Sequence, residues 1–191
     1  MSKKKMKEPY IPSEHSLKGL KGAPSEWVKR FIPKLPKGGR VLDLACGCGR
    51  NTRLLASCGF EVVGADIDER CRPYIEAIPG AVFVQADFEG SPWPFEPKSF
   101  DAVLVSFYLE RRLYQNLFEV LKEDGFLIYE TFMLPYPGFD GNRAKNPDFV
   151  LKPLELIDVY RDQMEILAYG QELGEKGDCF QQFLAQKSLR S

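Results

Sequence analysis

Short apolar runs alternate with amphipathic stretches along most of the chain, a pattern typical of parallel strands separated by helices. Runs rich in Val, Leu, Ile, Ala or Phe predict strands at 41–45, 60–66, 81–86, 100–106 and 126–132. Apolar residues three or four positions apart predict helices at 24–32, 50–58, 69–77 and 110–122. Because such crossovers are right-handed, we expect the helices to cover both faces of one sheet.

The segment after the fifth expected strand departs from this alternation. A loop at 134–149, rich in Pro and Gly, is followed by a helix at 154–161. Strands are then expected at 165–173 and 179–185, and their short connection predicts an antiparallel hairpin. The predicted fold class is α/β: a Rossmann-like doubly wound sheet of seven strands, mostly parallel, with an antiparallel C-terminal hairpin.

Length, composition and charge fit one domain without a general attraction to polyanions. The chain has 191 residues, 44% of them hydrophobic, and a formal net charge of −1. Residues 1–23 are expected to be a mobile N-terminal arm and residues 24–191 the domain. No apolar run approaches the ~20 residues of a membrane helix, and the Lys-rich start lacks the apolar core of a secretory signal.

The cysteines predict a reducing compartment. The chain has five of them, an odd number at irregular spacing, which argues against a disulfide framework and for the cytoplasm. Cys46 and Cys48 have neither a second cysteine pair nor nearby histidines, so we expect no zinc site and no other metal. Both are interpreted as small packing residues.

The segment VLDLACGCGRNT at 41–52 is the centre of the predicted function. It reads as a strand, a glycine-rich turn and the start of a helix, which directs backbone N–H groups at whatever lies above the turn. Asp66, at the end of the next strand, follows Gly47 by 66 − 47 = 19 positions, close to the ~20 at which an acid reaches a ribose hydroxyl. A nucleoside cofactor is therefore expected; the alternative is a turn whose glycines only serve packing.

The turn also favours one type of cofactor. A dinucleotide fingerprint needs Gly or Ala at position 52, where this chain has Thr. Asp43 would repel a pyrophosphate but suits a cofactor with a cationic amino group. An NAD-type oxidoreductase is thus the weaker alternative.

The segment from Asp43 to Gly49 resembles the acid-x-Gly-x-Gly-x-Gly motif of class I S-adenosylmethionine (SAM) methyltransferases, with Ala45 in place of the first Gly. Three stretches resemble the small bacterial tellurite-resistance-like subgroup: DLACGCGR at 43–50, YETF at 129–132 and NPDF at 146–149. Where those enzymes are thought to use a late His-Arg pair, this chain has Gly174-Glu175, which puts tellurite in doubt as a substrate.

The resemblance implies a set of cofactor contacts. Asp66 should bind the ribose hydroxyls, Ile67 should pack on the adenine, and Asp87 with Phe88 should bind the adenine edge. The alternative for Asp87 is a turn-capping role. Asp43 and the carbonyl of Ala45 or Ser106 should face the methionine amino group. The expected cofactor-binding residues are Asp43, Ala45, Cys46, Gly47, Gly49, Asp66, Ile67, Asp87, Phe88 and Ser106.

Candidate acceptor-side residues follow the fourth and fifth strands. Tyr108 and Glu130 are candidate bases, with Tyr129 as a further one, and Arg111 could hold an anionic acceptor. The alternative is an Arg111–Glu130 ion pair that only shapes the site. The loop at 134–149 is the expected substrate loop, and the expected aromatic residues of the acceptor site are Trp27, Tyr108, Phe132 and Tyr136. In this family an N-terminal arm often folds over the cofactor, so His15 could belong to a lid or simply be solvated.

Several acceptors do not fit the sequence. Nucleic-acid amine methylases carry Asn/Asp-Pro-Pro-aromatic after strand four, where this chain has SFYL at 106–109; cytosine C5 enzymes need Pro-Cys, which does not occur. The predicted partner is therefore a small-molecule methyl acceptor, with no nucleic acid or membrane, for a monomer or weak homodimer. A non-catalytic SAM-binding regulatory module is the main alternative.

Overall fold

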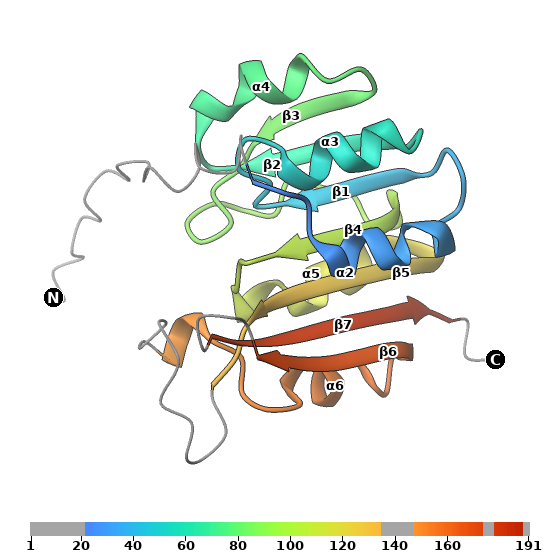
Figure 1. The fold of residues 1–191 in the computed structure, drawn as a ribbon, viewed down its shortest axis with the longest axis vertical. Helices are drawn as coiled ribbons and strands as arrows, with labels where there is room; N and C mark the ends of the chain where they lie inside the picture. The colour runs from blue at the N-terminus through green and yellow to red at the C-terminus, as the bar shows by residue number, and fades with distance from the viewer. Residues whose placement is uncertain (1–21, 135–146, 174–177, 189–191) are drawn as a thin grey trace, which may run out of the picture.

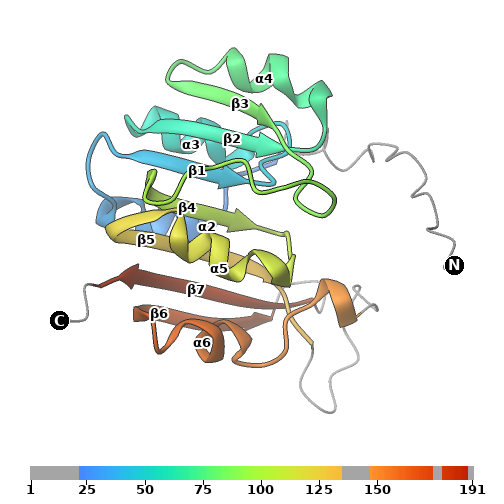
Figure 2. The same ribbon diagram turned by 180° about the vertical axis from the view of Figure 1, so that it is seen from behind.

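The computed structural model describes residues 22–134, 147–173 and 178–188, which form a seven-stranded sheet with helices on both faces (Figure 1, Figure 2). The strands are β1 (Arg40–Leu44), β2 (Glu61–Asp66), β3 (Ala81–Gln85), β4 (Phe100–Ser106), β5 (Leu121–Phe132), β6 (Met164–Leu173) and β7 (Cys179–Lys187). The α-helices are α2 (Glu26–Phe31), α3 (Arg50–Ser57), α4 (Arg72–Glu76), α5 (Tyr114–Glu119) and α6 (Glu155–Tyr160). Single 3-10 turns are η1 (Ile32–Lys34), η2 (Glu69–Cys71), η3 (Arg111–Leu113) and η4 (Pro147–Phe149).

The strand order is β3-β2-β1-β4-β5-β7-β6. Strands β1 to β5 pair in parallel, and β7 is antiparallel to both of its neighbours, β5 and β6. The expected α/β class, the seven strands and the antiparallel hairpin of β6 and β7 are confirmed. In the hairpin, β7 lies inside the sheet and β6 forms the edge.

The two faces of the sheet bury separate groups of apolar side chains. On one face, Leu42 and Leu44 of β1 share a core with Leu117 of α5 and Tyr160 of α6. On the other face, alternate strand residues meet α2 and α3 through Trp27 and Leu55, among others. Figures 1 and 2, drawn from opposite sides, show α2 and α3 in front of the sheet in one view and α5 and α6 in front in the other.

Two predicted helices differ from the structure at their ends. The helix expected at 69–77 begins as a 3-10 turn, and α4 proper starts at Arg72 with Pro73 in its first turn. The helix expected at 110–122 is shorter, because Leu121 belongs to β5, where it is paired with Phe100. The register shift between Phe100 and Ala102 accommodates Asp124, which has a φ of +62°.

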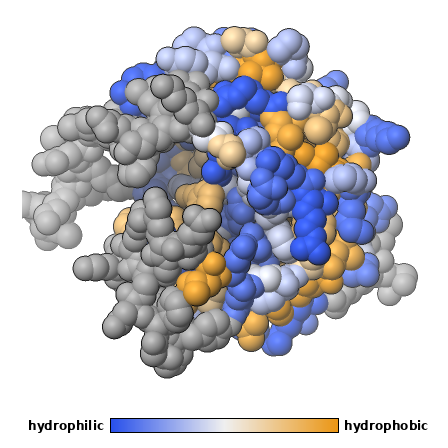
Figure 3. Space-filling model, in the orientation of Figure 1, coloured by the Kyte–Doolittle hydropathy of each residue, from blue (hydrophilic) through white to orange (hydrophobic). Residues whose placement is uncertain are grey.

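The carboxyl ends of the parallel strands meet at one edge of the sheet, on the left in Figure 1. Asp66 at the end of β2 is paired with Gln85 of β3, and the N–H of Ala86 donates to the Asp66 carbonyl at 3.0 Å. Asp87 therefore lies on the same edge as Asp66. In the same orientation, Figure 3 shows the described surface receding at this edge, with hydrophobic and hydrophilic residues both in view.

Candidate functional site

The glycine-rich turn connects β1 to α3 at the carboxyl edge. Ala45, Gly47 and Gly49 all have positive φ, at +53°, +52° and +87°. Ala45, where the motif has its first Gly, thus has a left-handed backbone conformation that Gly adopts more readily. Gly49 precedes the first turn of α3, and a Cβ added there would come within 2.5 Å of Ile75 Cδ1. Glycine is therefore favoured at position 49 for two reasons, the positive φ and the close packing of Ile75 from α4.

Asp66 holds this turn in place. One carboxylate oxygen accepts a hydrogen bond from the N–H of Gly47 at 2.8 Å, and the other accepts from the N–H of Asp68 at 2.9 Å. The side chain is 8% exposed, and burial raises its pKa above the usual value despite these hydrogen bonds. A direct hydrogen bond thus joins Gly47 and Asp66, which are 19 positions apart. The contact of Asp66 with a ribose stays a prediction.

Asp43 lies beneath the turn. Its carboxylate is 2% exposed and accepts a hydrogen bond from the Thr52 hydroxyl at 2.6 Å. Burial raises its pKa to about 6, against the opposing effects of Thr52 and the Arg50 charge. Its contact with a cofactor amino group remains a prediction.

The third acidic residue caps a turn. Oδ1 of Asp87 accepts from the N–H groups of Glu89 and Gly90 at 3.0 and 2.9 Å, as the capping alternative expects. Phe88 is buried and packs on Trp93 with ring centroids 5.8 Å apart. Ile67 is half-buried, on the same edge of the sheet. The adenine contacts of Ile67, Asp87 and Phe88 stay predictions.

Ser106 and Glu130 are brought together at the ends of β4 and β5. The two residues are register partners, and the Ser106 hydroxyl donates to Glu130 Oε1 at 2.8 Å. Arg50, at the start of α3, donates through Nη2 to Ser106 Oγ at 2.9 Å. Sequence reasoning missed Arg50, although its place directly after the glycine-rich turn was a usable signal.

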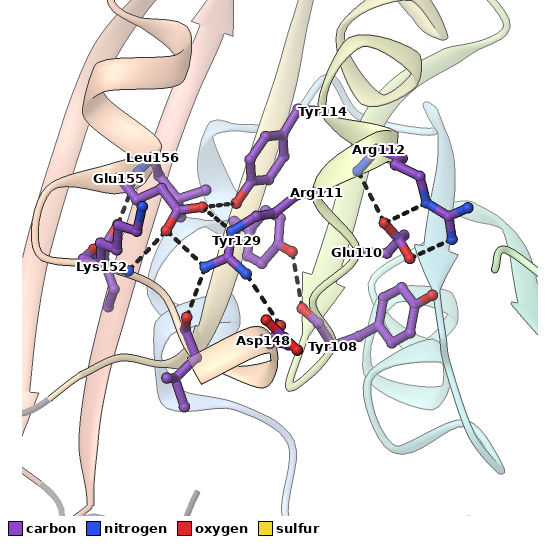
Figure 4. Close-up of polar contacts among 12 residues, drawn as sticks. Tyr108, Glu110, Arg111, Arg112, Tyr114, Tyr129, Asp148, Lys152, Glu155 and Leu156 are labelled. Atoms are coloured by element: carbon purple, nitrogen blue, oxygen red, sulfur yellow. Dashed lines mark hydrogen bonds and ion pairs between the residues drawn. The ribbon is translucent and has the colours of Figure 1, made fainter. Parts of the chain in front are cut away.

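Arg111 pairs with Glu155, so the alternative of an Arg111–Glu130 ion pair is wrong. Its guanidinium contacts Glu155 at 2.7 and 3.0 Å and donates to the carbonyls of Asp148 and Val150 (Figure 4). Its pKa is raised, mainly by the hydrogen bonds to Glu155. The guanidinium connects η3 to Glu155 of α6 and does not pair with Glu130.

Two other aromatic candidates lie in the protein core. Tyr129 is 1% exposed and its hydroxyl donates to the Tyr108 carbonyl at 2.9 Å, so it is held in the core (Figure 4). Burial raises the pKa of Tyr108 well above its usual value, which disfavours a phenolate at neutral pH. Trp27 is buried under the sheet, with Nε1 donating to the Phe183 carbonyl, so its expected place in the acceptor site is wrong.

Other expected features lie outside the described residues. These are the N-terminal arm up to residue 21 with His15, and residues 135–146 of the substrate loop with Tyr136.

The cysteines differ from expectation. Cys48 and Cys71 form a disulfide, with their Cα atoms 4.6 Å apart, whereas the odd cysteine count had predicted no disulfide framework. The pair is 23 residues apart in sequence but adjacent in space, because both residues follow carboxyl ends of neighbouring strands. Cys46 keeps a free thiol whose pKa is raised, first by burial and then by Asp43 and Asp66.

Within residues 22–134, 147–173 and 178–188, no three His, Cys, Asp or Glu side chains are arranged to hold a metal ion. The same residues include no helix of sufficient length and apolar character to span a bilayer.

Three carboxylates lie near the carboxyl ends of the first three strands. Asp43 lies one residue before the end of β1, Asp66 ends β2 and Asp87 follows β3. Carboxylates can accept hydrogen bonds from hydroxyl groups and pair with cations. Positive φ at Ala45 and Gly47 gives the turn the tight path that lets a backbone approach a ligand.

Comparisons with known proteins agree with this geometry. A family model described as a methyltransferase domain matches residues 16–169. A demethylmenaquinone methyltransferase of Clavibacter sepedonicus is 36% identical over 107 residues, 51% of this chain and 43% of that protein. The chain spans about half the length of the curated relatives it matches.

Solved structures share the fold. TehB from Haemophilus influenzae has a TM-score of 0.72 at 22% identity, covering 91% of this chain and 65% of that one. A SAM-dependent methyltransferase of Methanosarcina mazei has a TM-score of 0.68 at 20% identity, covering 88% and 100%. With the family match over most of its length, the chain belongs to the methyltransferase-domain family.

Proposed function

We propose that this protein transfers a methyl group from SAM to a small-molecule acceptor by in-line displacement. The observation that carries the proposal is the hydrogen bond by which the Asp66 carboxylate, at the end of β2, accepts from the N–H of Gly47 in the glycine-rich turn at 2.8 Å. This contact fixes a turn and a carboxylate at the edge where doubly wound sheets bind nucleosides.

The residues divide into a cofactor side and an acceptor side. The proposed cofactor contacts are those expected from the sequence, at the ends of β1, β2 and β3 and at Ser106. SAM supplies an activated methyl group, so the protein mainly has to align the acceptor with it. Glu130, beside Ser106, is the proposed acceptor for a proton that the nucleophile loses.

The acceptor is proposed to be a small metabolite. The relative from Clavibacter is named for a small organic substrate, demethylmenaquinone, which supports this class. The sequence motifs at 43–50, 129–132 and 146–149 further support a place near the tellurite-resistance-like subgroup. We propose a cytoplasmic monomer or weak homodimer that needs neither nucleic acid nor membrane.

Calorimetry tests the cofactor assignment. Titration with S-adenosylhomocysteine (SAH), the demethylated product, should give binding, whereas NADH should give none; the reverse result would support an oxidoreductase. Asp66→Ala removes the charged acceptor of the proposed ribose hydrogen bonds and should weaken SAH binding by about 1.5–3 kcal/mol for each bond lost. Glu61→Ala, an exposed carboxylate at the other end of β2, is the matched control and should leave the affinity unchanged.

Turnover separates an enzyme from a regulatory binding module. A labelled-methyl screen over phenols, thiols and oxyanions should yield a methylated product, whereas a regulatory module would bind SAH without turnover. Glu130→Gln should slow turnover more than it weakens SAH binding. An equal loss in both would assign Glu130 to the scaffold instead.

A further inference from the structure

Three phenylalanines gather where β4 and β5 end and β7 begins. The ring centroids of Phe107, Phe132 and Phe180 lie 5.1 to 5.7 Å from one another. Of these three residues, the Phe cluster, Phe107 directly follows β4, and Phe132 and Phe180 belong to the neighbouring strands β5 and β7. Each is at least partly exposed, and Phe107 is 43% exposed. An apolar group in this position is available to a ligand at the edge.

The backbone of Phe107 is held in an unusual conformation. Its φ is +58°, a region that a bulky aromatic residue rarely adopts. The N–H of Phe107 donates to the Glu130 carbonyl at 2.9 Å, which fixes this conformation. A strained backbone that keeps an apolar ring exposed is typical of ligand-binding positions.

Charged groups lie beside the Phe cluster. The Arg50 guanidinium carbon is 5.1 Å from the centroid of the Phe107 ring, and the guanidinium also donates to Ser106. Ser106 in turn donates to Oε1 of Glu130, a side chain that is only 6% exposed.

Both charged groups have unused hydrogen-bonding capacity in the described part of the chain. There, Arg50 forms no ion pair, and Oε2 of Glu130 accepts no hydrogen bond from any residue. A buried carboxylate oxygen without a donor favours a ligand that brings one.

We propose that the acceptor is a planar aromatic molecule bearing a hydroxyl group, a phenol in the broad sense. Its ring packs on the Phe cluster, its hydroxyl donates to Glu130, and its oxygen lies within reach of Arg50. The inference rests on the proposed function, since it names the substrate class of the same site. A free oxyanion would meet the Glu130 carboxylate and leave the Phe cluster unused, and an aliphatic alcohol would lack the ring.

Three matched ligands test the two halves of this recognition. 2-Naphthol has both ring and hydroxyl, 2-methoxynaphthalene lacks the donor, and 2-decalol lacks the aromatic ring. Titrated into the full chain with SAH present, 2-naphthol should bind about tenfold more tightly than either analogue. Equal affinity for the three ligands would overturn the proposal.

Variants then locate the binding site. Phe107→Ala and Phe107→Leu should each weaken 2-naphthol binding about fivefold or more, with the Leu variant retaining apolar area but not the aromatic face. Glu130→Gln should reduce the preference for 2-naphthol over 2-methoxynaphthalene. Tyr74→Ala removes a comparably exposed aromatic residue on α4 and is the matched control, expected to change nothing. Unchanged binding in both Phe107 variants would overturn the proposal.

Failure of this inference is distinguishable from failure of the proposed function. SAH binding is measured separately on the same samples and should be unaltered by Phe107→Leu. If SAH does not bind, the proposed function is wrong, and the same three ligands titrated into the protein alone still decide whether the Phe cluster selects a phenol.

Discussion

At the residue scale, the buried carboxylate of Asp43 differs from the other acids at the edge. Asp66 accepts two backbone hydrogen bonds, whereas Asp43 has the Thr52 hydroxyl and the more distant charge of Arg50. Burial outweighs both and raises the pKa of Asp43 to about 6. An unfolded chain would ionise the same group near pH 3.9.

The raised pKa of Asp43 predicts a pH-dependent loss of stability. Between about pH 4 and pH 6, folded Asp43 retains a proton that the unfolded chain has released, so the free energy of unfolding falls as pH rises. The loss reaches about 3 kcal/mol above pH 6. Urea unfolding from pH 4 to pH 7 should show this slope in the wild type, and Asp43→Asn should show a clearly smaller one, to which the raised pKa of Asp66 still contributes. Parallel curves for the two proteins would refute the burial argument.

Arg111 is the residue whose predicted role changed most. The sequence places it near Glu130, but only the fold shows that Glu155, 44 residues later, lies beside it. The pKa of Glu155 is lowered although burial opposes this, because Arg111, Tyr114 and the N–H of Lys152 all donate to its carboxylate (Figure 4).

This network predicts a stabilising role for Arg111. Arg111→Lys loses the fork that spans Glu155 and the Val150 carbonyl, so the free energy of unfolding should fall by about 1–3 kcal/mol, with SAH affinity unchanged. Arg112→Lys is the control, because that exposed residue pairs with nearby Glu110, and its substitution should leave the free energy of unfolding almost unchanged. Weaker SAH binding in Arg111→Lys would return the residue to the site.

At the element scale, α3 is flanked by two glycines that have the same φ. Gly49 precedes the helix and Gly59 follows it, and both have a φ of +87°. They differ in surroundings, because a Cβ at Gly49 meets Ile75 whereas nothing lies within 4 Å at Gly59.

The comparison separates packing from backbone strain. Gly59→Ala should lower the free energy of unfolding by about 1 kcal/mol, which is the cost of placing Ala in a left-handed conformation. Gly49→Ala adds a clash with the Ile75 side chain, so its free energy of unfolding, measured in urea, should fall by about 1–3 kcal/mol more than that of Gly59→Ala. Equal losses would mean that Ile75 moves aside freely.

The elements were largely predictable because their signals are local. The apolar runs and the glycine-rich turn lie within single segments, so the strands, α3 and the acids at the edge followed from sequence. Contacts between distant segments could not be predicted, because they depend on which strands become neighbours. Examples are the Cys48–Cys71 disulfide, the hydrogen bond from Arg50 to Ser106 and the burial of Trp27. The end of α5 was misplaced for the same reason, because pairing with Phe100 draws Leu121 into β5.

At the scale of the whole molecule, sheet order places the proposed cofactor and acceptor sides next to each other. β1 pairs with β4 and β4 with β5, so the glycine-rich turn, Ser106 and Glu130 lie on consecutive strands. The Phe cluster continues the same edge onto β7. A ligand that spans both sides would therefore cross the sheet at the position where its strand order reverses.

The position of β7 between β5 and β6 affects how the chain folds during its synthesis. β6 is made before β7, yet in the described sheet its one neighbour is β7, which itself needs β5. Until residues 179–187 leave the ribosome, residues 164–173 lack the strand with which they pair in the folded sheet. The backbone N–H and C=O groups of β5 that pair with β7 are unpaired as well. A nascent chain stalled before that point would carry two unsatisfied edges, and chaperone capture should peak there.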